Sequence, residues 1–299
     1  MRKMTIQEAW QDCVEKILAQ PSRILVIGET TTGKTSFVTS LAQTGYKKGI
    51  ETAVLDMDVG QSNIGPPTTI GLGFVREEIN SLSEIKPEKI YFIGNTSPLG
   101  KEREFARGLK EILPIARKAE LLVVESVAFF KDQGFRDKML ALEIEIIKPD
   151  HIVVLKVGVP YQENSLADGG KVFSLPGMIK KSKRNLLQRK RFRIESWQRY
   201  LKEGKVYNLS QKRFLTNPGR VIKHSPFIGQ AVGLTDMQGS HLAAGVVFEK
   251  NEDNLLVFAP PVKGMGEDNL NFIFGEIKVE GGVLNFIKEE VNEKKSTFS

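Results

Sequence analysis

The stretch Gly28-Glu-Thr-Thr-Thr-Gly33-Lys34-Thr35 fits the pattern G-x-x-x-x-G-K-[ST], and this feature most constrains the fold. An apolar, β-branched run (residues 23–27) precedes it and a helix-like segment (35–46) follows it, which is the context that a phosphate-binding loop requires. Backbone N–H groups of such a loop, with the positive end of the next helix, bind phosphate oxygens. Lys34 is then expected to reach the β- and γ-phosphates, and the Thr35 hydroxyl to hold Mg²⁺. The predicted nucleotide-binding residues of this loop are Gly28, Glu29, Thr30, Thr31, Thr32, Gly33, Lys34, Thr35 and Ser36.

The rest of the first two thirds alternates apolar runs with helix-length segments. This alternation predicts an α/β fold, a P-loop NTPase with a doubly wound, mainly parallel sheet and helices on both faces. The expected strands are 23–27, 52–56, 89–93, 121–125 and 151–157, and the expected helices are 5–19, 35–46, 101–118, 135–147 and 183–201.

After about residue 208 short β-rich pieces alternate with turn residues, which predicts a small C-terminal antiparallel β domain of hairpins. The last residues, NEKKSTFS, are expected to form a frayed tail. The predicted organisation is an N-terminal helix packed on the core, a P-loop domain that includes a basic helix, and the β domain. Their ranges are 1–20, 21–208 with the basic helix at about 180–203, and 209–299.

Composition excludes several classes of protein. No apolar run approaches the roughly 20 residues that cross a bilayer, and the first residues lack the apolar stretch of a signal peptide, so no membrane contact is expected. A single cysteine, Cys13, excludes an intrachain disulfide and a cysteine-based zinc cage. These features favour a cytoplasmic protein.

The net charge of +7 is concentrated in one segment. Residues 180–205 contain eleven Lys or Arg and two acids. Ile194, Trp197 and Leu201 make a helical stripe that is expected to dock on the body and leave the arginines free. Charges of one sign repel each other without a partner, so a contact with phosphate is predicted. Either a lid arginine on a transferred phosphoryl group or a track for a nucleic-acid backbone satisfies this pattern.

Two further loops follow predicted strands and are expected at the same edge of the sheet, where ligands bind. Asp56 and Asp58 lie in Leu55-Asp-Met-Asp-Val-Gly-Gln61. Beside a Mg²⁺–triphosphate, one carboxylate could support the metal and its waters while the other orients an attacking hydroxyl. The loop Gly94-Asn-Thr-Ser-Pro-Leu-Gly-Lys101 adds hydroxyls and a lysine.

Taken together, the motifs GETTTGKTS, VLDMDVGQSNIGPPTTIGLG, IGNTSPLG, RKRFR and QAVGLTDMQGSHLAAGVV resemble those of the polynucleotide 5'-hydroxyl kinases. That family includes RNA kinases of pre-mRNA 3'-end cleavage, tRNA splicing and ribosomal RNA processing, and short archaeal relatives. The resemblance covers most of the chain, and its most specific part is D-x-D-x-G-Q followed by I-G-P-P. It implies ATP and Mg²⁺ as cofactors and transfer of the γ-phosphate to the 5'-hydroxyl end of RNA or DNA.

The resemblance also implies residue roles. The catalytic residues are expected to be Lys34, Asp58, Arg189 and Arg193, with Asp58 positioning and deprotonating the 5'-hydroxyl and the arginines forming an R-x-x-x-R lid. Thr35 and Asp56 are the expected metal residues, and Gln61, Thr96 and Ser97 are expected beside the nucleotide.

Two departures from the family pattern are expected to matter. After the fourth strand the family has Asp or Asn, then Thr, then Gly one residue later, whereas this chain has Glu125-Ser-Val-Ala128. Altered geometry or reduced activity follows if that segment holds the metal or the nucleotide, because Ala lacks the conformational freedom of Gly. Thr31 stands where many relatives have Asp.

The sequence therefore predicts an ATP-dependent polynucleotide 5'-hydroxyl kinase, with RNA favoured over DNA as substrate. A catalytically weak ATP-binding scaffold of an RNA-processing complex and a nucleotide-switch ATPase remain as alternatives. Protein partners could bind through the C-terminal β domain.

Overall fold

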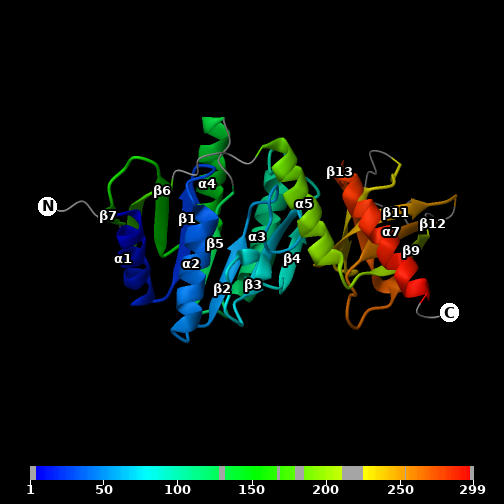
Figure 1. The fold of residues 1–299 in the computed structure, drawn as a ribbon, viewed down its shortest axis with the longest axis horizontal. Coiled ribbons are helices and arrows are strands. Elements are labelled where there is room, and N and C mark those ends of the chain that lie inside the picture. The colour runs from blue at the N-terminus through cyan, green and yellow to red at the C-terminus, as the bar shows by residue number, and fades with distance from the viewer. Residues whose placement is uncertain are drawn as a thin grey trace.

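A computed structural model describes residues 5–127, 132–166, 169–178, 185–210, 225–252 and 254–296 of the chain. An eight-stranded sheet with the order β4-β3-β2-β5-β1-β6-β8-β7 forms the first part (Figure 1). Its strands are β1 (Arg23–Gly28), β2 (Thr52–Asp56), β3 (Thr69–Phe74), β4 (Lys89–Phe92), β5 (Leu121–Glu125), β6 (His151–Lys156), β7 (Gln162–Ser165) and β8 (Lys171–Pro176). The central strands β2, β5, β1, β6 and β8 run parallel, which confirms the predicted doubly wound α/β fold.

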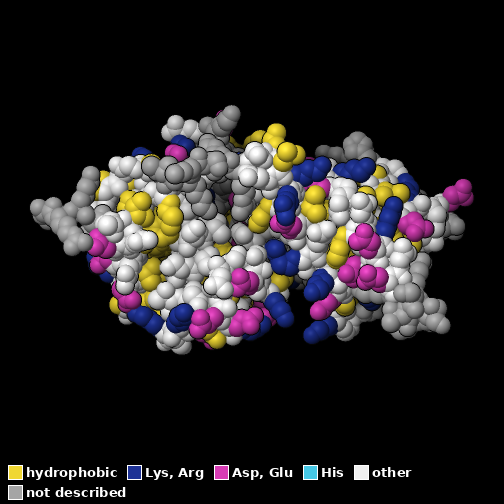
Figure 2. Space-filling model, viewed as in Figure 1, with side chains coloured by type: hydrophobic (Ala, Val, Ile, Leu, Met, Phe, Trp, Pro, Cys, Tyr) yellow, Lys and Arg dark blue, Asp and Glu magenta, His cyan; other side chains and the backbone are white. Residues whose placement is uncertain are grey.

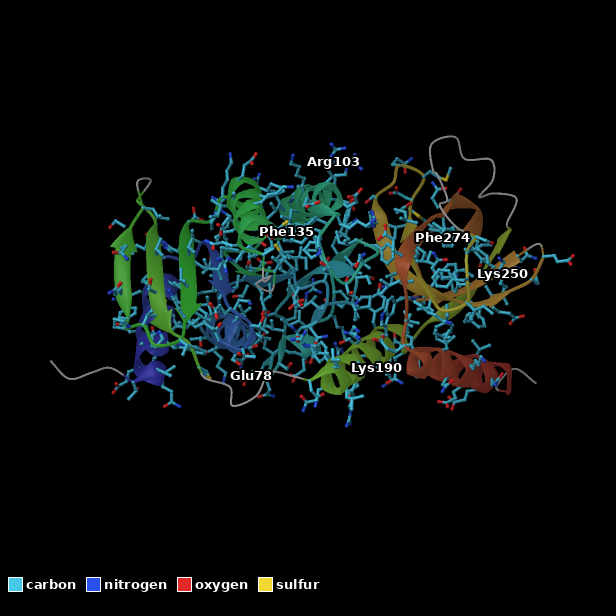
Figure 3. All side chains as sticks on the ribbon, turned by 90° about the horizontal axis from the view of Figure 1, so that it is seen from above. Glu78, Arg103, Phe135, Lys190, Lys250 and Phe274 are labelled. Carbon is cyan, nitrogen blue, oxygen red and sulfur yellow. The ribbon has the colours of Figure 1, made fainter. Side chains whose placement is uncertain are left out.

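Helices cover both faces of this sheet. On one face lie α1 and α2, and on the other lie α3 and α4 (Figure 3). The reason is visible in β1, where Ile24 and Val26 point into the cluster with α1 and α2, while Leu25 points into the cluster with α3 and α4. The helices of the chain are α1 (Ile6–Leu18), α2 (Lys34–Lys47), α3 (Glu102–Ala116), α4 (Gln133–Ile147), α5 (Leu186–Leu201) and α7 (Gly281–Ser296). None of the described helices is both long and apolar enough to cross a bilayer.

The sequence pattern did not predict β3, β7 and β8. β3 and β4 form an antiparallel edge, and β7 pairs antiparallel with β8 at the other edge. Two glycines interrupt the apolar pattern of β3, and the sequence of β7, QENS, is fully exposed. β3 is nevertheless buried, whereas β7 is a strand because its backbone pairs with β8 and not because its own side chains are buried.

A second sheet, of five antiparallel strands in the order β13-β10-β11-β12-β9, forms the other part of the molecule. Its strands are β9 (Lys205–Ser210), β10 (Gln230–Thr235), β11 (His241–Lys250), β12 (Asn254–Ala259) and β13 (Asn271–Lys278). The predicted C-terminal hairpins therefore exist. The expectation for residues 281–296, a β-rich piece followed by a frayed tail, was wrong. These residues form helix α7, whose Val283 and Ile287 side chains are buried. The predicted start of the β domain at residue 209 falls within β9, and residues 211–224 lie outside the described residues.

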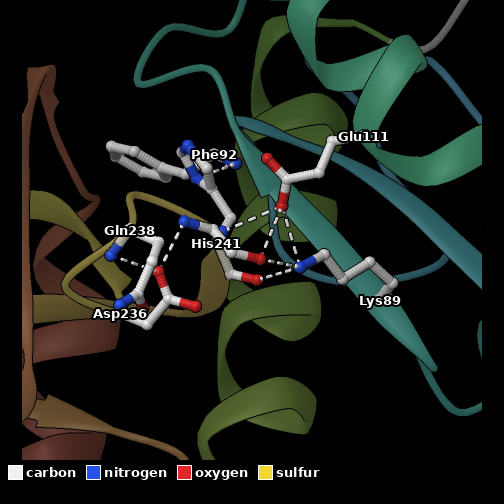
Figure 4. Close-up of polar contacts among 7 residues, drawn as sticks. Lys89, Phe92, Glu111, Asp236, Gln238 and His241 are labelled. Carbon is white, nitrogen blue, oxygen red and sulfur yellow. Dashed lines mark hydrogen bonds and ion pairs between the residues drawn. The ribbon is translucent and has the colours of Figure 1, made fainter.

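The two sheets meet where β11 packs beside the edge strand β4, and a polar cluster fastens this joint (Figure 4). Glu111 of α3 forms an ion pair with Lys89 Nζ (2.8 Å) and accepts a hydrogen bond from the backbone N–H of His241 (2.9 Å). His241 is buried, accepts a bond at Nδ1 from the backbone N–H of Phe92 (3.0 Å), and stacks on Tyr91. The joint thus ties the position of the second sheet to strand β4.

A second buried carboxylate fixes the chain just beyond β5. Glu143 of α4 is fully buried and accepts hydrogen bonds from the Ser126 hydroxyl (2.7 Å) and the backbone N–H of Val127 (3.3 Å). Burial raises the pKa of Glu143 to about 7, and these two bonds only partly offset the rise. Glu143 therefore holds the segment after β5 against α4.

Replacing Glu111 by alanine should weaken the joint. The change removes the carboxylate that pairs with Lys89 and accepts the N–H of His241, although Lys89 keeps the Ser240 hydroxyl and the carbonyl oxygen of His241 as acceptors. We therefore expect a loss of about 1–2 kcal/mol in the free energy of unfolding. Urea unfolding followed by tryptophan fluorescence measures it, since Trp197 lies in the cluster between the sheets. Lys110→Ala, an exposed neighbour, is the control; equal stability of the two variants would contradict the role of Glu111.

Glu143 should make stability depend on pH. The folded-state pKa of about 7 exceeds the ordinary value of 4.5, so the folded protein holds more protons between these values. The contribution of Glu143 is complete below about pH 4.5 and is lost as the pH rises through about 7. We expect the free energy of unfolding of Glu143→Gln, which mimics the protonated acid, to fall less over this window, by on the order of 2 kcal/mol. Parallel pH profiles of the two proteins would refute this assignment.

Candidate active site at the carboxyl edge of the parallel strands

The phosphate-binding loop links β1 to α2 and has a tight, strained backbone. Gly33 has φ +95°, and a side chain there would meet the ring of Trp10 at 3.0 Å. A Cβ on Gly28 would lie 2.7 Å from the carbonyl oxygen of Leu155, so both glycines are required by close contacts. Thr31 also has positive φ, at 76°. Helix α2 begins at Lys34 without a side-chain cap, which leaves its first N–H groups available for an anion.

Lys34 lies across its own loop. Its ammonium donates a hydrogen bond to the carbonyl oxygen of Gly28 (2.8 Å), and the side chain is 7% exposed. The loop is held from outside by the backbone N–H of Met178, which donates to the carbonyl oxygen of Thr32 (2.9 Å). Thr32 in turn donates its hydroxyl to Glu29 (2.8 Å). The loop is thus ordered by protein contacts, with one buried positive charge inside it.

Thr35, the predicted metal residue of the loop, donates its hydroxyl to Oε1 of Glu125 (2.6 Å). Glu125 ends β5, the strand between β1 and β2, and it is 3% exposed. Its second oxygen, Oε2, is buried and has no hydrogen-bond partner among the described residues. The sequence analysis named Glu125 only as a departure from the family pattern. Its position at the end of a predicted buried parallel strand was the signal that could have identified it as a site residue. Ala128, the other departure, lies outside the described residues.

Asp56 and Asp58 organise the loop after β2. Asp56 is fully buried, and its carboxylate accepts the backbone N–H groups of Asp58 (3.0 Å), Asn63 (2.6 Å) and Ile64 (3.2 Å). Asp58 is half-buried, and its Oδ1 accepts the N–H groups of Gly60 (3.1 Å) and Gln61 (3.0 Å). The two aspartates therefore differ: Asp56 faces inward to backbone donors, while Asp58 reaches partly into solvent.

Two buried carboxyl groups, those of Asp56 and Glu125, surround one buried ammonium group, that of Lys34. Burial raises the pKa of Asp56 to about 6, with repulsion from Asp58 as the next cause. Burial and then repulsion from Asp56 raise the pKa of Glu125 to about 8, and Lys34 opposes that rise. A divalent cation would relieve this repulsion. The Thr35 hydroxyl, the unpartnered oxygen of Glu125 and the carboxylate of Asp56 are hard oxygen donors of the kind that Mg²⁺ prefers.

Helix α5 borders the loop that follows β2. Gln61 Nε2 donates to the carbonyl oxygen of Arg189 (3.4 Å), and the Ser196 hydroxyl donates to that of Ser62 (3.4 Å). The second half of the helix is anchored, since Trp197 and Leu201 are buried in the cluster between the two sheets. The apolar stripe thus docks as predicted, and Figure 1 shows α5 lying between the two parts of the chain. Residues 180–184 of the predicted helix lie outside the described residues.

The expectation that the arginines of α5 stay free was wrong for three of them. Arg193 Nε pairs with Glu280 Oε1 (2.6 Å), Arg191 pairs with Glu195 (2.7 Å), and Arg199 donates to the carbonyl oxygen of Asn63 (3.3 Å). The partner of Arg191 lies one turn along the same helix, whereas Glu280, between β13 and α7, and the carbonyl oxygen of Asn63 are distant in sequence. Arg189 has no ion-pair partner within the described part of the chain. Lys190 points outward from α5 (Figure 3), and dark blue side chains mark this helix in the centre of Figure 2.

The loop with Thr96 and Ser97 lies against the loop after β2. A Cβ on Gly60 would come within 2.8 Å of the carbonyl oxygen of Thr96, so the two backbones touch. The Ser97 hydroxyl accepts the N–H of Leu99 (3.2 Å). Glu276 of β13 binds this loop from the second sheet, through Asn95 (3.1 Å) and Lys101 (2.6 Å). Sequence reasoning missed Glu276, because nothing local marks a partner 175 residues away.

Comparisons with known proteins agree with this architecture. Residues 28–203 match the model of the family described as mRNA cleavage and polyadenylation factor CLP1 P-loop. The chain is 34% identical over 198 residues to a polyribonucleotide 5'-hydroxyl-kinase of Methanocaldococcus jannaschii, covering 64% of this chain and 53% of that protein. It is 31% identical over 196 residues to a polyribonucleotide 5'-hydroxyl-kinase of Pyrococcus furiosus, covering 64% and 54%. The chain spans about half the length of these curated relatives.

A solved structure of wild-type Clp1p in complex with Pcf11p superposes with a TM-score of 0.69. The likeness covers 93% of this chain and 80% of that one at 13% identity, so it supports the fold alone. The family model spans the phosphate-binding loop, the loop after β2 and helix α5, the three parts that meet in the candidate site. The chain belongs to the mRNA cleavage and polyadenylation factor CLP1 P-loop family.

Proposed function

We propose that this protein is an ATP- and Mg²⁺-dependent polynucleotide 5'-hydroxyl kinase that acts on RNA 5' ends. The observation that carries the proposal is the meeting of a phosphate-binding loop with an aspartate loop and a basic helix at one edge of the sheet. The names of the archaeal relatives support the same activity. Phosphoryl transfer needs positioned groups and charge stabilisation more than covalent help from the protein, and these three parts provide both.

The loop residues bind the ATP phosphates. Lys34 would leave the carbonyl oxygen of Gly28 and donate to the β- and γ-phosphates. A charged phosphate oxygen is a better acceptor for an ammonium group than a neutral carbonyl oxygen. Thr35 would ligate Mg²⁺, and Asp56 would support it from β2. When bound, Mg²⁺ neutralises charge on the phosphates. Thr96 and Ser97 would lie at the nucleotide, since their loop contacts the loop after β2.

Asp58 would orient the attacking hydroxyl. Two backbone donors fix its Oδ1, and its Oδ2 takes no hydrogen bond from the described residues. That oxygen would accept the proton of the 5'-hydroxyl as the sugar oxygen bonds to the γ-phosphorus and ADP leaves. Gln61, whose side chain contacts α5, would place the γ-phosphate between this loop and the helix.

Arg189 and Arg193 would act as the lid on the transferred phosphoryl group. The backbone of Arg189 is already joined to Gln61. Arg193 would exchange Glu280 for phosphate, because both are anionic oxygen acceptors and a phosphate carries the larger charge.

Asp58→Asn should abolish transfer while leaving the loop intact. An asparagine Oδ1 still accepts from Gly60 and Gln61, but the side chain no longer accepts a proton, so we expect kcat to fall by about 10²- to 10⁴-fold. The measurement is incorporation of labelled γ-phosphate into a 5'-hydroxyl oligoribonucleotide, with Lys34→Ala as the inactive reference. Asp236→Asn is the matched control, because Asp236 Oδ1 also accepts two backbone N–H groups but lies in the second sheet. Wild-type turnover by Asp58→Asn would remove Asp58 from the mechanism.

Replacing the lid arginines should reduce turnover more than ATP affinity. We expect Arg189→Ala and Arg193→Ala to lower kcat by about 100-fold, because charge on the phosphoryl group grows in the transition state. Arg191→Ala is the comparison on the same helix, where an exposed ion pair contributes little. Steady-state kinetics with varied ATP separate kcat from KM. A rise in KM without loss of kcat would reject the lid role.

One assay also separates the competing functions. With labelled ATP and a 5'-hydroxyl oligoribonucleotide present, a kinase moves label into the oligonucleotide. A switch ATPase releases label as free phosphate, and a scaffold leaves it on ATP.

A further inference from the structure

Two glutamates near the carboxyl end of β13 bind basic side chains from two different parts of the candidate site. Glu276 Oε1 pairs with Lys101 Nζ of the loop after β4 (2.6 Å), and Glu280 Oε1 pairs with Arg193 Nε of α5 (2.6 Å). The backbone N–H of Glu276 also donates to the carbonyl oxygen of Gly94 (2.8 Å). The second sheet therefore holds both a loop and the basic helix of the site through its own carboxylates.

The pair of Arg193 and Glu280 is shielded from water. Their side chains are 27% and 14% exposed, whereas the side chains of Arg191 and Glu195, which pair on the same helix, are 82% and 52% exposed. A charged hydrogen bond with little access to water is stronger than a pair at the surface, where solvent competes for both partners. Glu280 therefore holds Arg193 much more firmly than Glu195 holds Arg191.

Glu280 is part of a fixed backbone segment between β13 and α7. The backbone N–H of Val279 donates to the carbonyl oxygen of Gly229 (2.8 Å), and the N–H of Val283 donates to that of Glu280 (2.9 Å). Val279 and Val283 are buried in the apolar cluster that also contains the anchored half of α5. The carboxylate is thus fixed relative to the helix, so the long side chain of Arg193 is the partner that moves.

Arg193 lies on the face of α5 that borders the loop after β2. Positions i, i+4 and i+7 share one face of a helix, and Arg189, Arg193 and Ser196 occupy them. Gln61 Nε2 donates to the carbonyl oxygen of Arg189, and the Ser196 hydroxyl donates to that of Ser62 (3.4 Å each). Because Arg193 lies between these two contacts, its guanidinium group can turn either to its carboxylate or to a phosphate bound beside this loop.

We propose that Glu280 is an autoinhibitory carboxylate: without nucleotide it occupies the guanidinium group of Arg193, and this pair must break before Arg193 reaches the transferred phosphoryl group. The proposal rests on the proposed kinase function and adds regulation of a lid arginine by the second sheet. Because Glu280 lies between β13 and α7, a displacement of that segment changes how tightly Arg193 is held. The second sheet then sets the rate of transfer, although it contains none of the groups that contact ATP.

The rate of phosphoryl transfer in a single turnover tests this contact, with labelled ATP and a 5'-hydroxyl oligoribonucleotide. Glu280→Gln removes the charge that competes for Arg193 and keeps the size of the side chain, so we expect transfer about 5- to 30-fold faster than in the wild type. Glu195→Gln, the same change at the exposed pair with Arg191, should transfer at the wild-type rate. An unchanged or slower rate in Glu280→Gln would overturn the proposal, because Glu280 would then support Arg193 and not compete for it.

A double-mutant cycle establishes whether the effect passes through Arg193. Glu280→Gln should not accelerate transfer in a protein that already carries Arg193→Ala, and equal acceleration in both backgrounds would overturn the proposal. If Glu280→Gln does not fold, Glu280→Asp decides, since its shorter side chain keeps the charge but no longer reaches Arg193. A folded Glu280→Asp variant that transfers no faster than the wild type also overturns the proposal.

Binding of ADP with aluminium fluoride, which mimics the transferred phosphoryl group, separates this proposal from the kinase itself. In calorimetric titrations with Mg²⁺ and without polynucleotide, Glu280→Gln should bind this complex about 5- to 30-fold more tightly than the wild type and bind ADP alone equally. A wild type that transfers no label would contradict the kinase, whereas tighter binding by Glu280→Gln would still support the autoinhibitory contact. A kinase whose Glu280→Gln variant neither transfers faster nor binds the complex more tightly would do the reverse.

Discussion

The candidate site depends on one constraint: three neighbouring parallel strands end at the same edge of the sheet. Each of them brings a titratable side chain into a buried position. β1 leads to Lys34, β5 ends in Glu125 and β2 ends in Asp56. Burial, and then the mutual repulsion of the two carboxyl groups, raises the pKa values of Asp56 and Glu125. A cation bound with a polyphosphate would offset this repulsion, in line with the proposed function. Burying these titratable groups lowers the stability of the fold, and strongly shifted pKa values of this kind are common at functional sites.

The second sheet contributes to the same edge from a distance. Glu276 binds the Thr96 loop, Glu280 binds Arg193, and the cluster around Glu111 and His241 fixes that sheet to β4. Helix α5 is held between the two sheets at its carboxyl end and contacts Gln61 near its start. The C-terminal part of the chain therefore helps to position the loops and the arginines of the candidate site.

Much of the fold could be predicted because local pattern and burial agree in it. The four central strands β2, β5, β1 and β6 are mainly apolar, and the capping box of Thr5 and Glu8 begins α1 where the sequence indicates. Prediction failed where pairing or packing overrides pattern. β7 is polar throughout, and α7 has a Gly-Gly start and a short apolar run that reads as a strand until Val283 and Ile287 pack against the second sheet.

For the site, the sequence by itself determined the phosphate-binding loop, the aspartate loop and the presence of a basic helix, because each is a short contiguous motif whose chemistry is local. Only the tertiary structure decided which carboxylate holds Thr35, which backbone groups occupy Asp56, and which arginines are already paired. Those facts depend on strand register and on residues up to 136 positions apart. Hydrogen bonds form between residues that are neighbours in space, and the order of strands in the sheet decides which residues these are. No single segment of the sequence specifies that order.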